Sequence, residues 1–362
     1  MTTNESALRI SRDTPLAPLT TIGIGGAARF FVTAREKNTL IEALGWAQER
    51  GHDVLILGGG SNLLVSDEGF DGLVIHLDLR GVELSPENGT TLIDSAAGED
   101  WDALVATAVE RGLAGIECLS GIPGRVGATP IQNVGAYGQE VSETVVEVEA
   151  LDRHTGSVVT IPNEKCEFGY RDSRFKSREK DRYVILSVRY RLRDGGAPTI
   201  RYSDLETHLA EEGITSPTLA DVRRTVLNIR SGKGMVIDEN DPDSRSAGSF
   251  FTNPVIPEEE LDGFLRRVKG AGVLEDGESV PRFPAGENLV KLSAAWIIQH
   301  AGFHRGLVHG NVGLSSKHTL AIVNRGGGTA AEVLELVEMI RQRVQRLFGI
   351  ELVPEPNFVG FE

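Results

Sequence analysis

The first part of the chain alternates strand-like hydrophobic runs with segments of helical periodicity. Residues 28–34 are strand-like, 37–51 carry apolar side chains at helical spacing, and 53–57 form an apolar run that ends on glycines. A second stretch repeats this order, with a strand-like segment at 90–98 and a helical one at 100–112 before another glycine-rich loop. The pattern predicts two similar α/β lobes.

The pattern changes further along the chain. Residues 144–153 and 157–161 flank a short turn and predict an antiparallel pair, and 183–193 has the composition of a further strand. After Asp194 we expect mainly loops, followed by a helix at 219–230.

A domain boundary is predicted at the polar loop 231–248. Beyond it, 329–349 is amphipathic with Gly349 as a plausible C-cap, and we interpret it as a core-facing helix rather than a partner-binding surface.

Composition indicates a soluble globular protein. The chain has 362 residues, 40% of them hydrophobic and 25% charged, which suits two or three domains. Its formal charge of −15 argues against nonspecific nucleic-acid binding, which depends on Lys and Arg at phosphates. A small anionic ligand would therefore need a local basic patch.

Cysteine usage and hydropathy favour the cytoplasm. Cys118 and Cys166 lack any paired spacing, so both are predicted to be reduced thiols. No run approaches the roughly 18 apolar residues of a membrane span. The N-terminus lacks the basic and apolar regions of a signal peptide, so neither export nor membrane spanning is predicted.

Two glycine loops are the first candidates for chemistry. One, Gly58 to Asn62, follows an apolar strand and offers close backbone approach and amide donors to a phosphate, although a tight structural turn is an equal alternative. In the other, Gly121, Gly124 and Gly127 are three residues apart. Two such loops at the ends of successive α/β units favour a dinucleotide cofactor.

A metal site is not predicted. His300 and His304 have the i, i+4 spacing of a helical metal pair, and His309 and His318 follow. Gly302 weakens a helix there, however, and no H-E-x-x-H pattern is present.

Six ordered segments carry a resemblance to a known family. They are LGGGSNLL, IPGRVGATPIQNVGAYG, FGYRDSRFK, RYSDL, GSFFTNP and VPEPNFVG. From about Thr20 to Gly360 the chain resembles the UDP-N-acetylenolpyruvoylglucosamine reductases, and RYSDL is similar to the class with an extra loop that covers the substrate.

The resemblance implies an α+β fold. We expect a two-lobed FAD-binding region of the vanillyl-alcohol-oxidase type and a C-terminal α+β substrate-binding domain. The implied boundaries are 1–78 and 79–229 for the two lobes and 230–348 for the substrate domain, with the tail, about 349–362, returning to the active site. A cytoplasmic monomer is expected.

The implied reaction is the reduction of UDP-N-acetylglucosamine enolpyruvate to UDP-N-acetylmuramate, in peptidoglycan precursor synthesis. NADPH would reduce non-covalently bound FAD, and hydride would then reach the vinyl carbon, so that a carbanion develops beside the carboxylate. That charge needs stabilising donors and a general acid.

Motif correspondence assigns the catalytic roles. Ser249 would donate the proton, Arg171 would meet the substrate carboxylate, and Glu355 would orient or protonate the intermediate. Without the family, each of the three would be interpreted as a turn, cap or surface residue.

Ligand contacts follow by the same correspondence. The implied substrate contacts are Tyr202, Lys233, Asn253 and His300. The implied flavin contacts are Gly58, Gly59, Gly60, Ser61, Asn62, Ile122, Gly124, Gly127, Gln132, Asn133, Gly135, Ala136 and Tyr137. Tyr137 has the alternatives of facing substrate or nicotinamide, or of packing as a loop aromatic.

Three positions depart from the family pattern. Arg230 competes with Lys233 as the phosphate contact, because 234–245 is longer than the usual spacing. His300 stands where Gln is more frequent, and Thr252 where Lys is frequent.

Two other functions remain as alternatives. A related alcohol or sugar oxidase often tethers flavin through His or Cys, and here Cys118 lies shortly before the second glycine loop. A sugar-nucleotide-binding regulator would keep the fold without hydride transfer, although simple binding would not require Ser249, Arg171 and Glu355 together.

Overall fold

The chain divides into two compact units. The structure, a computed structural model, describes residues 8–274 and 277–361. Unit 1 comprises the described part of 1–14 together with Ala28–Gly59 and Asp71–Gly232. Unit 2 comprises Pro15–Ala27, Gly60–Phe70 and the described part of 233–362. The predicted boundary between lobes at 78/79 stays a prediction.

The first sheet of unit 1 contains the predicted β-α-β unit. Its strand order is β1 (Ser11–Pro15), β2 (Ala27–Ala34), β5 (Phe70–Leu77) and β3 (Val54–Leu57), with β3 and β5 parallel. The helix α1 (Lys37–Arg50) connects β2 to β3, and its buried side chains Leu40, Ala43 and Ala47 recur at helical spacing. It ends at Gly51, whose left-handed φ of 66° suits glycine.

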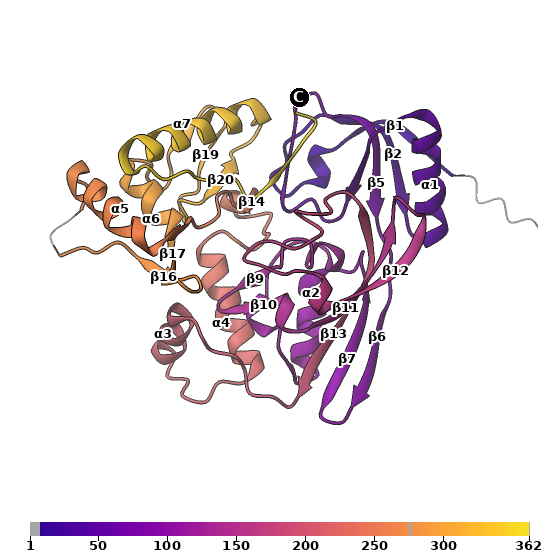
Figure 1. The fold of residues 1–362 in the computed structure, drawn as a ribbon, viewed down its shortest axis with the longest axis horizontal. Coiled ribbons are helices and arrows are strands. Elements are labelled where there is room, and N and C mark those ends of the chain that lie inside the picture. Colours follow the sequence, from indigo (N-terminus) through magenta and orange to yellow (C-terminus); the bar gives the residue numbers. More distant parts are fainter. Residues whose placement is uncertain (1–7, 275–276, 362) are drawn as a thin grey trace, which may run out of the picture. The chain divides into compact units, whose positions relative to one another are not determined.

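The second sheet of unit 1 is antiparallel at every strand pair described here (Figure 1). Its order is β12 (Ser157–Pro162), β11 (Val145–Asp152), β13 (Tyr183–Asp194), β7 (Thr90–Ala96) and β6 (Val82–Glu87). The predicted strand pair is confirmed, with Asp152 opposite Ser157 across the turn. The expected similarity of the lobes is wrong in detail, because β6 and β7 form a hairpin before α2 (Trp101–Glu110).

The helices that follow this sheet include one that the pattern did not predict. We expected mainly loops after Asp194, but α3 (Ser203–Glu211) forms there, followed by the predicted α4 (Leu219–Gly232). Leu205 and Leu209, one helical turn apart, are buried in a small core with Cys118. The i, i+4 pair was the available signal, but it is too short to stand out from the polar residues around it.

Unit 2 has its own core and three small sheets. The sheet orders are β14 (Ser246–Ser249), β20 (Ala321–Asn324), β19 (Val312–Leu314) and β18 (Val308–His309); β15 (Val255–Pro257), β17 (Leu289–Leu292) and β16 (Arg282–Pro284); and β21 (Asn357–Val359) with β4 (Leu63–Val65). The helices are α5 (Glu258–Ala271), α6 (Ala294–His300) and α7 (Ala330–Phe348).

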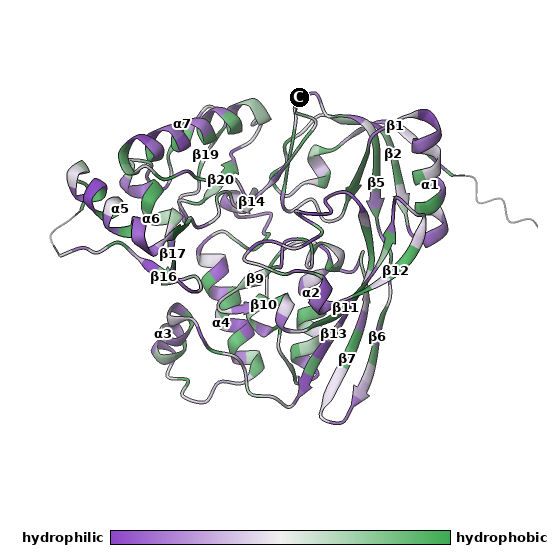
Figure 2. Ribbon diagram, in the orientation of Figure 1, coloured by the Kyte–Doolittle hydropathy of each residue, from purple (hydrophilic) through white to green (hydrophobic). Residues whose placement is uncertain are grey.

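The helix α7 confirms the predicted amphipathic segment. Its hydrophobic and hydrophilic residues alternate along the ribbon in Figure 2, and the apolar positions are buried in the core of unit 2. Thr329 and Glu332 form a capping box, and Gly349 ends the helix with a left-handed φ of 68°.

Two short N-terminal segments belong to unit 2, where Ile22, Ile24 and Leu64 lie in its core, β4 pairs with β21, and polar side chains add further bonds. The Asn324 side chain donates to the carbonyl of Ile22 (3.0 Å), and the Asp67 carboxylate accepts the amides of Ala330 (2.7 Å) and Ala331 (3.0 Å). A carboxylate at these first amides of α7 complements the helix dipole. Among the described residues, no helix combines the length and hydropathy needed to cross a bilayer.

Candidate active site

The two glycine loops meet within unit 1. Gly58 and Gly59 follow directly after β3, and a Cβ added to Gly59 would lie only 2.8 Å from the Cα of Gly124. Gly124 itself has a φ of 121°, which disfavours any other residue. This close backbone approach fits a dinucleotide, whose phosphates need amides without intervening side chains.

The second loop is anchored on the connection between β7 and α2. The amide of Gly127 donates to the carbonyl of Ala97 (2.9 Å), and a Cβ on Gly127 would lie 2.6 Å from the Cβ of Ala97. Tight packing therefore explains this glycine without any ligand. It also gives the loop a defined path towards Gly124.

The end of the first loop belongs to unit 2 and contacts the C-terminal tail. Ser61 and Asn62 precede β4, which pairs in parallel with β21. The Asn62 side chain donates to the carbonyl of Glu355 (3.3 Å), and the amide of Asn357 donates to the carbonyl of Asn62 (3.0 Å). The tail thus returns to the first glycine loop.

The tail also contacts the segment that follows Ser249. Ser249 is the last residue of β14 and pairs with Ala321 of β20. The amide of Glu355 donates to the carbonyl of Phe250 (2.9 Å), and Phe251 forms a β-bridge with Pro354. Ser249 and Glu355, both half-buried, therefore come from adjacent backbone segments although 106 residues separate them in sequence.

Arg171 lies at the end of the second glycine loop. Its guanidinium donates to the carbonyl of Gly135 (2.7 Å), the first residue of β9 (Gly135–Ala136). The buried Asn133 side chain donates to the carbonyl of Gly169 (2.9 Å), just before Arg171. The structure thus brings a predicted catalytic residue and predicted flavin contacts together in unit 1.

Tyr137 and Tyr202 are neighbours in unit 1. Their rings are 5.6 Å apart in an edge-to-face arrangement, and both are half-buried. Burial raises the pKa of Tyr137 to about 12, against the opposing effect of the nearby Arg230 guanidinium. Tyr137 is therefore a neutral, packed aromatic that still has an accessible surface.

The two candidates for the phosphate contact differ in their surroundings. Burial lowers the pKa of Arg230, in the last turn of α4, while Tyr137 and Asp102 act in the opposite direction. Lys233 is the first residue of the C-terminal part of unit 2, and its charge contributes to lowering the pKa of His318. Arg230 therefore belongs to unit 1 and Lys233 to unit 2, and both stay candidates for the phosphate contact.

The remaining substrate candidates lie at the two ends of α6. Asn253 accepts a hydrogen bond from the amide of Ala294 (3.0 Å) at the start of this helix. At its other end, His300 stacks on Trp296 with ring centroids 3.8 Å apart and lies 3.0 Å from the Glu278 carboxylate. Thr252, on the segment beside the tail, donates its amide to the carbonyl of Val353 (3.1 Å).

Sequence reasoning missed two carboxylates, one just before the second loop and one that bonds to it. Glu117 is fully buried and accepts from the amides of Gly115 (2.7 Å) and Thr199 (2.8 Å) and from the Gln139 side chain (2.9 Å). Isolated acidic residues carry no pattern in a sequence, so no signal distinguished Glu117 from surface acids.

The second carboxylate is Asp102, on α2. It accepts from the amide of Gly121 (2.6 Å) and from both terminal nitrogens of Arg223 (2.6 and 2.8 Å). Burial alone would raise the pKa of Asp102, but these donors hold it below the ordinary value. The ion pair links the second glycine loop to α4.

The residues that the structure describes contain no group of three or more His, Cys, Asp or Glu side chains able to hold a metal. Helix α6 ends at His300, and Gly302 has a left-handed φ of 96°, so His300 and His304 do not share a helical face.

Comparisons with known proteins agree with this geometry. Residues 28–162 match a family described as "FAD binding domain", and 241–359 match "UDP-N-acetylenolpyruvoylglucosamine reductase, C-terminal domain". A UDP-N-acetylenolpyruvoylglucosamine reductase of Streptomyces coelicolor is 50% identical over 96% of this chain and 90% of its own length. That of Thermobifida fusca is 47% identical over 97% of this chain and 98% of its own.

A solved structure shows the same fold. The crystal structure of the UDP-N-acetylenolpyruvylglucosamine reductase of Thermus caldophilus has a TM-score of 0.66 and 27% identity, and the match covers 97% of this chain and 99% of that chain. The α+β fold class is confirmed, and fold and glycine loops together define an FAD-dependent oxidoreductase. More particularly, the chain belongs to the UDP-N-acetylenolpyruvoylglucosamine reductase family.

Proposed function

We propose that this protein reduces UDP-N-acetylglucosamine enolpyruvate to UDP-N-acetylmuramate with electrons from NADPH, as a cytoplasmic monomer in peptidoglycan precursor synthesis. The observation that carries the proposal is the pairing of the Ser249 and Glu355 segments in unit 2 through the amide of Glu355 and the carbonyl of Phe250. The proposed acid and the proposed carboxylate thus come from adjacent backbone segments, as the proposed chemistry requires. The relatives from Streptomyces coelicolor and Thermobifida fusca are named as reductases of UDP-N-acetylenolpyruvoylglucosamine, which agrees with the proposed substrate.

Bound FAD supplies the hydride chemistry between NADPH and the enolpyruvyl double bond. The residues proposed to hold it are Gly58, Gly59, Gly60, Ser61, Asn62, Ile122, Gly124, Gly127, Gln132, Asn133, Gly135, Ala136 and Tyr137. The close approach of Gly59 to Gly124 supports this assignment, because only bare backbone fits there.

Three side chains are proposed to stabilise the developing negative charge and to supply the proton. Arg171 binds the substrate carboxylate, and its fixed positive charge stabilises the electron density that develops there. Ser249 then delivers a proton to the adjacent carbon. Glu355 orients the substrate or relays the proton, since its backbone is tied to Phe250, next to Ser249.

The nucleotide part of the substrate is proposed to contact Tyr202, Asn253, His300 and either Lys233 or Arg230. Tyr202 offers an aromatic ring and a hydroxyl, and the cation pairs with a phosphate. Asn253 already accepts from the amide of Ala294, so its side-chain NH₂ is the group available to a ligand oxygen.

The environment of Cys118 argues against the oxidase alternative. Its thiol is fully buried and donates to the carbonyl of Thr199 (3.1 Å). Burial, together with the neighbouring Glu117 carboxylate, raises the pKa of this thiol far above its ordinary value. A thiolate for covalent attachment of flavin is therefore disfavoured.

Product analysis tests the proposed function. The FAD-loaded protein is incubated with NADPH and the enolpyruvyl sugar nucleotide, and the nucleotide is recovered for mass spectrometry and NMR. We expect a gain of two hydrogens and replacement of the vinyl signals by those of a lactyl ether. Oxidation of NADPH with an unchanged nucleotide would contradict the proposal.

A further inference from the structure

The segment that carries Arg171 has no helix or strand to hold it. Between β12 and β13 it forms a short 3-10 helix, η5 (Asn163–Lys165), and then turns and bends. Arg171 has a left-handed φ of 55°, and so do Glu167 (51°) and Asp181 (62°). Such a backbone is unfavourable for a residue other than glycine and persists only where surrounding contacts impose it.

One side of this segment contacts the second glycine loop. Besides the bond from Arg171 to Gly135, the Ser173 hydroxyl donates to the carbonyl of Ile131 (2.5 Å). Within the segment, the Lys176 ammonium donates to the carbonyl of Arg171 itself (2.8 Å). These contacts hold Arg171 against the second glycine loop and β9, and not against the large antiparallel sheet.

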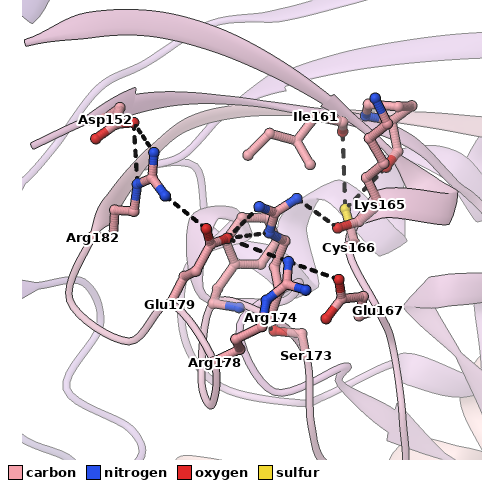
Figure 3. A network of polar contacts seen from close by, with 12 residues as sticks. Asp152, Ile161, Lys165, Cys166, Glu167, Ser173, Arg174, Arg178, Glu179 and Arg182 are labelled. Atoms are coloured by element: carbon pink, nitrogen blue, oxygen red, sulfur yellow. Dashed lines mark hydrogen bonds and ion pairs between the residues drawn. The ribbon is translucent and has the colours of Figure 1, made fainter. Parts of the chain in front are cut away.

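The other side is tied to the sheet through Glu179, as Figure 3 shows. The Glu179 carboxylate accepts from Arg174 and, at 2.7 Å, from Arg182. Arg182 also donates to Asp152 (2.7 Å), the last residue of β11, and Arg174 donates to the carbonyl of Lys165 (2.8 Å). One carboxylate therefore joins the two arginines that connect the segment to its flanking elements.

Three of the four side chains in this network are largely shielded from water, whereas Arg182 is 32% exposed. The side chains of Arg174, Glu179 and Asp152 are 13%, 15% and 4% exposed. The guanidinium carbons of Arg174 and Arg182 also lie 5.6 and 5.0 Å from the centre of the Tyr183 ring. Removing the Glu179 carboxylate would leave the shielded Arg174 guanidinium without this anion, which is costly. Arg182 would keep its bonds to Asp152 but lose its link to the segment.

A second ion pair on the same segment provides a contrast. Arg178 and Glu167 are 2.8 Å apart, but their side chains are 59% and 44% exposed. Pairs at that exposure contribute little to stability. Arg178 also approaches Glu179, at 3.9 Å, so this pair borders the network. Glu167, whose described ion pair is with Arg178, is a matched control for Glu179, with the same side chain on the same segment.

We propose that Glu179 is a positioning residue for Arg171. Through Arg174 and Arg182 it fixes the segment from Cys166 to Arg182, and thereby sets how the Arg171 guanidinium meets the substrate carboxylate. The catalytic part of this inference depends on the proposed role of Arg171, whereas the fixing of the segment does not.

The test compares Glu179→Gln with Glu167→Gln in the FAD-loaded protein. Glu179→Gln should slow the reoxidation of reduced flavin by the enolpyruvyl sugar nucleotide about 10- to 100-fold, because small displacements of a binding cation have effects of that size. Reduction of flavin by NADPH should stay within about twofold, since the role proposed for Arg171 is at the substrate carboxylate. Glu167→Gln should leave both half-reactions within the same range.

A double-mutant cycle with Arg171→Lys separates positioning from general destabilisation. If Glu179 acts through Arg171, its substitution should cost much less in the Arg171→Lys background. An equal loss in both backgrounds, an equal loss in both half-reactions, or no loss would each overturn the proposal. Should Glu179→Gln fail to fold, Arg182→Lys, which retains the charge, is tested in the same cycle with the same expectations.

Hydrogen exchange provides a readout that does not depend on activity. The amides from 166 to 182 should exchange at least several-fold faster in Glu179→Gln than in Glu167→Gln. Unchanged exchange would overturn the inference even in a fully active enzyme. Faster exchange in a protein that does not reduce the enolpyruvyl substrate would instead mean that the proposed function has failed and the structural role of Glu179 stands.

Discussion

The Arg171 segment of unit 1 and the Ser249–Glu355 region of unit 2 are held in different ways. Arg171 is presented by turns whose position depends on side-chain ion pairs centred on Glu179. Ser249 is placed by the pairing of its strand with Ala321 of β20, and Glu355 by a main-chain hydrogen bond to Phe250. Side-chain substitutions away from the chemistry should therefore affect the first region more than the second, where backbone changes should matter more.

Substitution of Ser249 should have the largest effect. Ser249→Ala removes the proposed general acid but keeps the backbone pairing, so reduction of the enolpyruvyl substrate should fall about 10²- to 10⁴-fold. Rapid mixing should show unchanged reduction of flavin by NADPH and an unchanged dissociation constant for the sugar nucleotide. A substrate half-reaction within a few-fold of wild type would contradict the assignment of the acid.

Arg171→Lys should have the next largest effect. The ammonium keeps the charge but loses the planar donors and the bond to the carbonyl of Gly135, so we expect about a 100-fold loss in the substrate half-reaction. Both kcat and the affinity for the enolpyruvyl substrate should fall. The control is Arg178→Lys, in the exposed ion pair of the same segment, which should leave both quantities unchanged. Equal losses in the two variants would contradict a specific role for Arg171.

A backbone change at Gly248 should affect the Ser249–Glu355 region of unit 2. Gly248, next to Ser249, has a φ of 77° and open space around its Cα, so Gly248→Ala introduces backbone strain without a clash. We expect a loss of about 1–2 kcal/mol in the free energy of unfolding, measured with urea.

The matched control is Gly270→Ala in the same unit. Gly270 lies in α5 and also has open space, so alanine should stabilise the protein by about 0.5–1 kcal/mol. Shifts of the same sign in the two variants would contradict the importance of backbone conformation at Gly248.

The last effect is a pH dependence of stability that involves His318, in the loop after β19. Burial, reinforced by Lys233 and Arg305, lowers the pKa of His318 to about 4, whereas an unfolded histidine has a pKa of about 6.5. Between these values only the unfolded state takes up the proton, so the unfolding free energy should fall as pH is lowered, by up to about 1.4 kcal/mol per unit. His318→Asn should remove this part of the pH dependence, and an unchanged slope in urea unfolding would contradict it.

Local elements could be predicted because their signals lie within the elements themselves. Helix α7 has a full amphipathic period, a capping box and a terminal glycine, and the antiparallel pair β11–β12 encloses a short turn. The family motifs identified the glycine loops and the candidate catalytic residues, whose chemical roles stay predictions.

Long-range features could not be predicted, because they depend on contacts between distant residues. Pro15–Ala27 and Gly60–Phe70 join unit 2 through contacts with residues far away in sequence, such as the β4–β21 pairing and the bonds of Asn324 and Asp67. Glu117 and Glu179 are isolated acids in the sequence, and only the fold surrounds them with donors. A lone charged residue is usually solvated, so sequence reasoning passes over those that are not.

The most direct test of the account is the anaerobic absorbance spectrum of the flavin in the purified protein. We expect NADPH to bleach the flavin band, and addition of the enolpyruvyl sugar nucleotide to restore it without oxygen, since the account requires both half-reactions. If only oxygen restores the band, the oxidase alternative is correct. If no flavin binds even after reconstitution, the assignment of the glycine loops is contradicted.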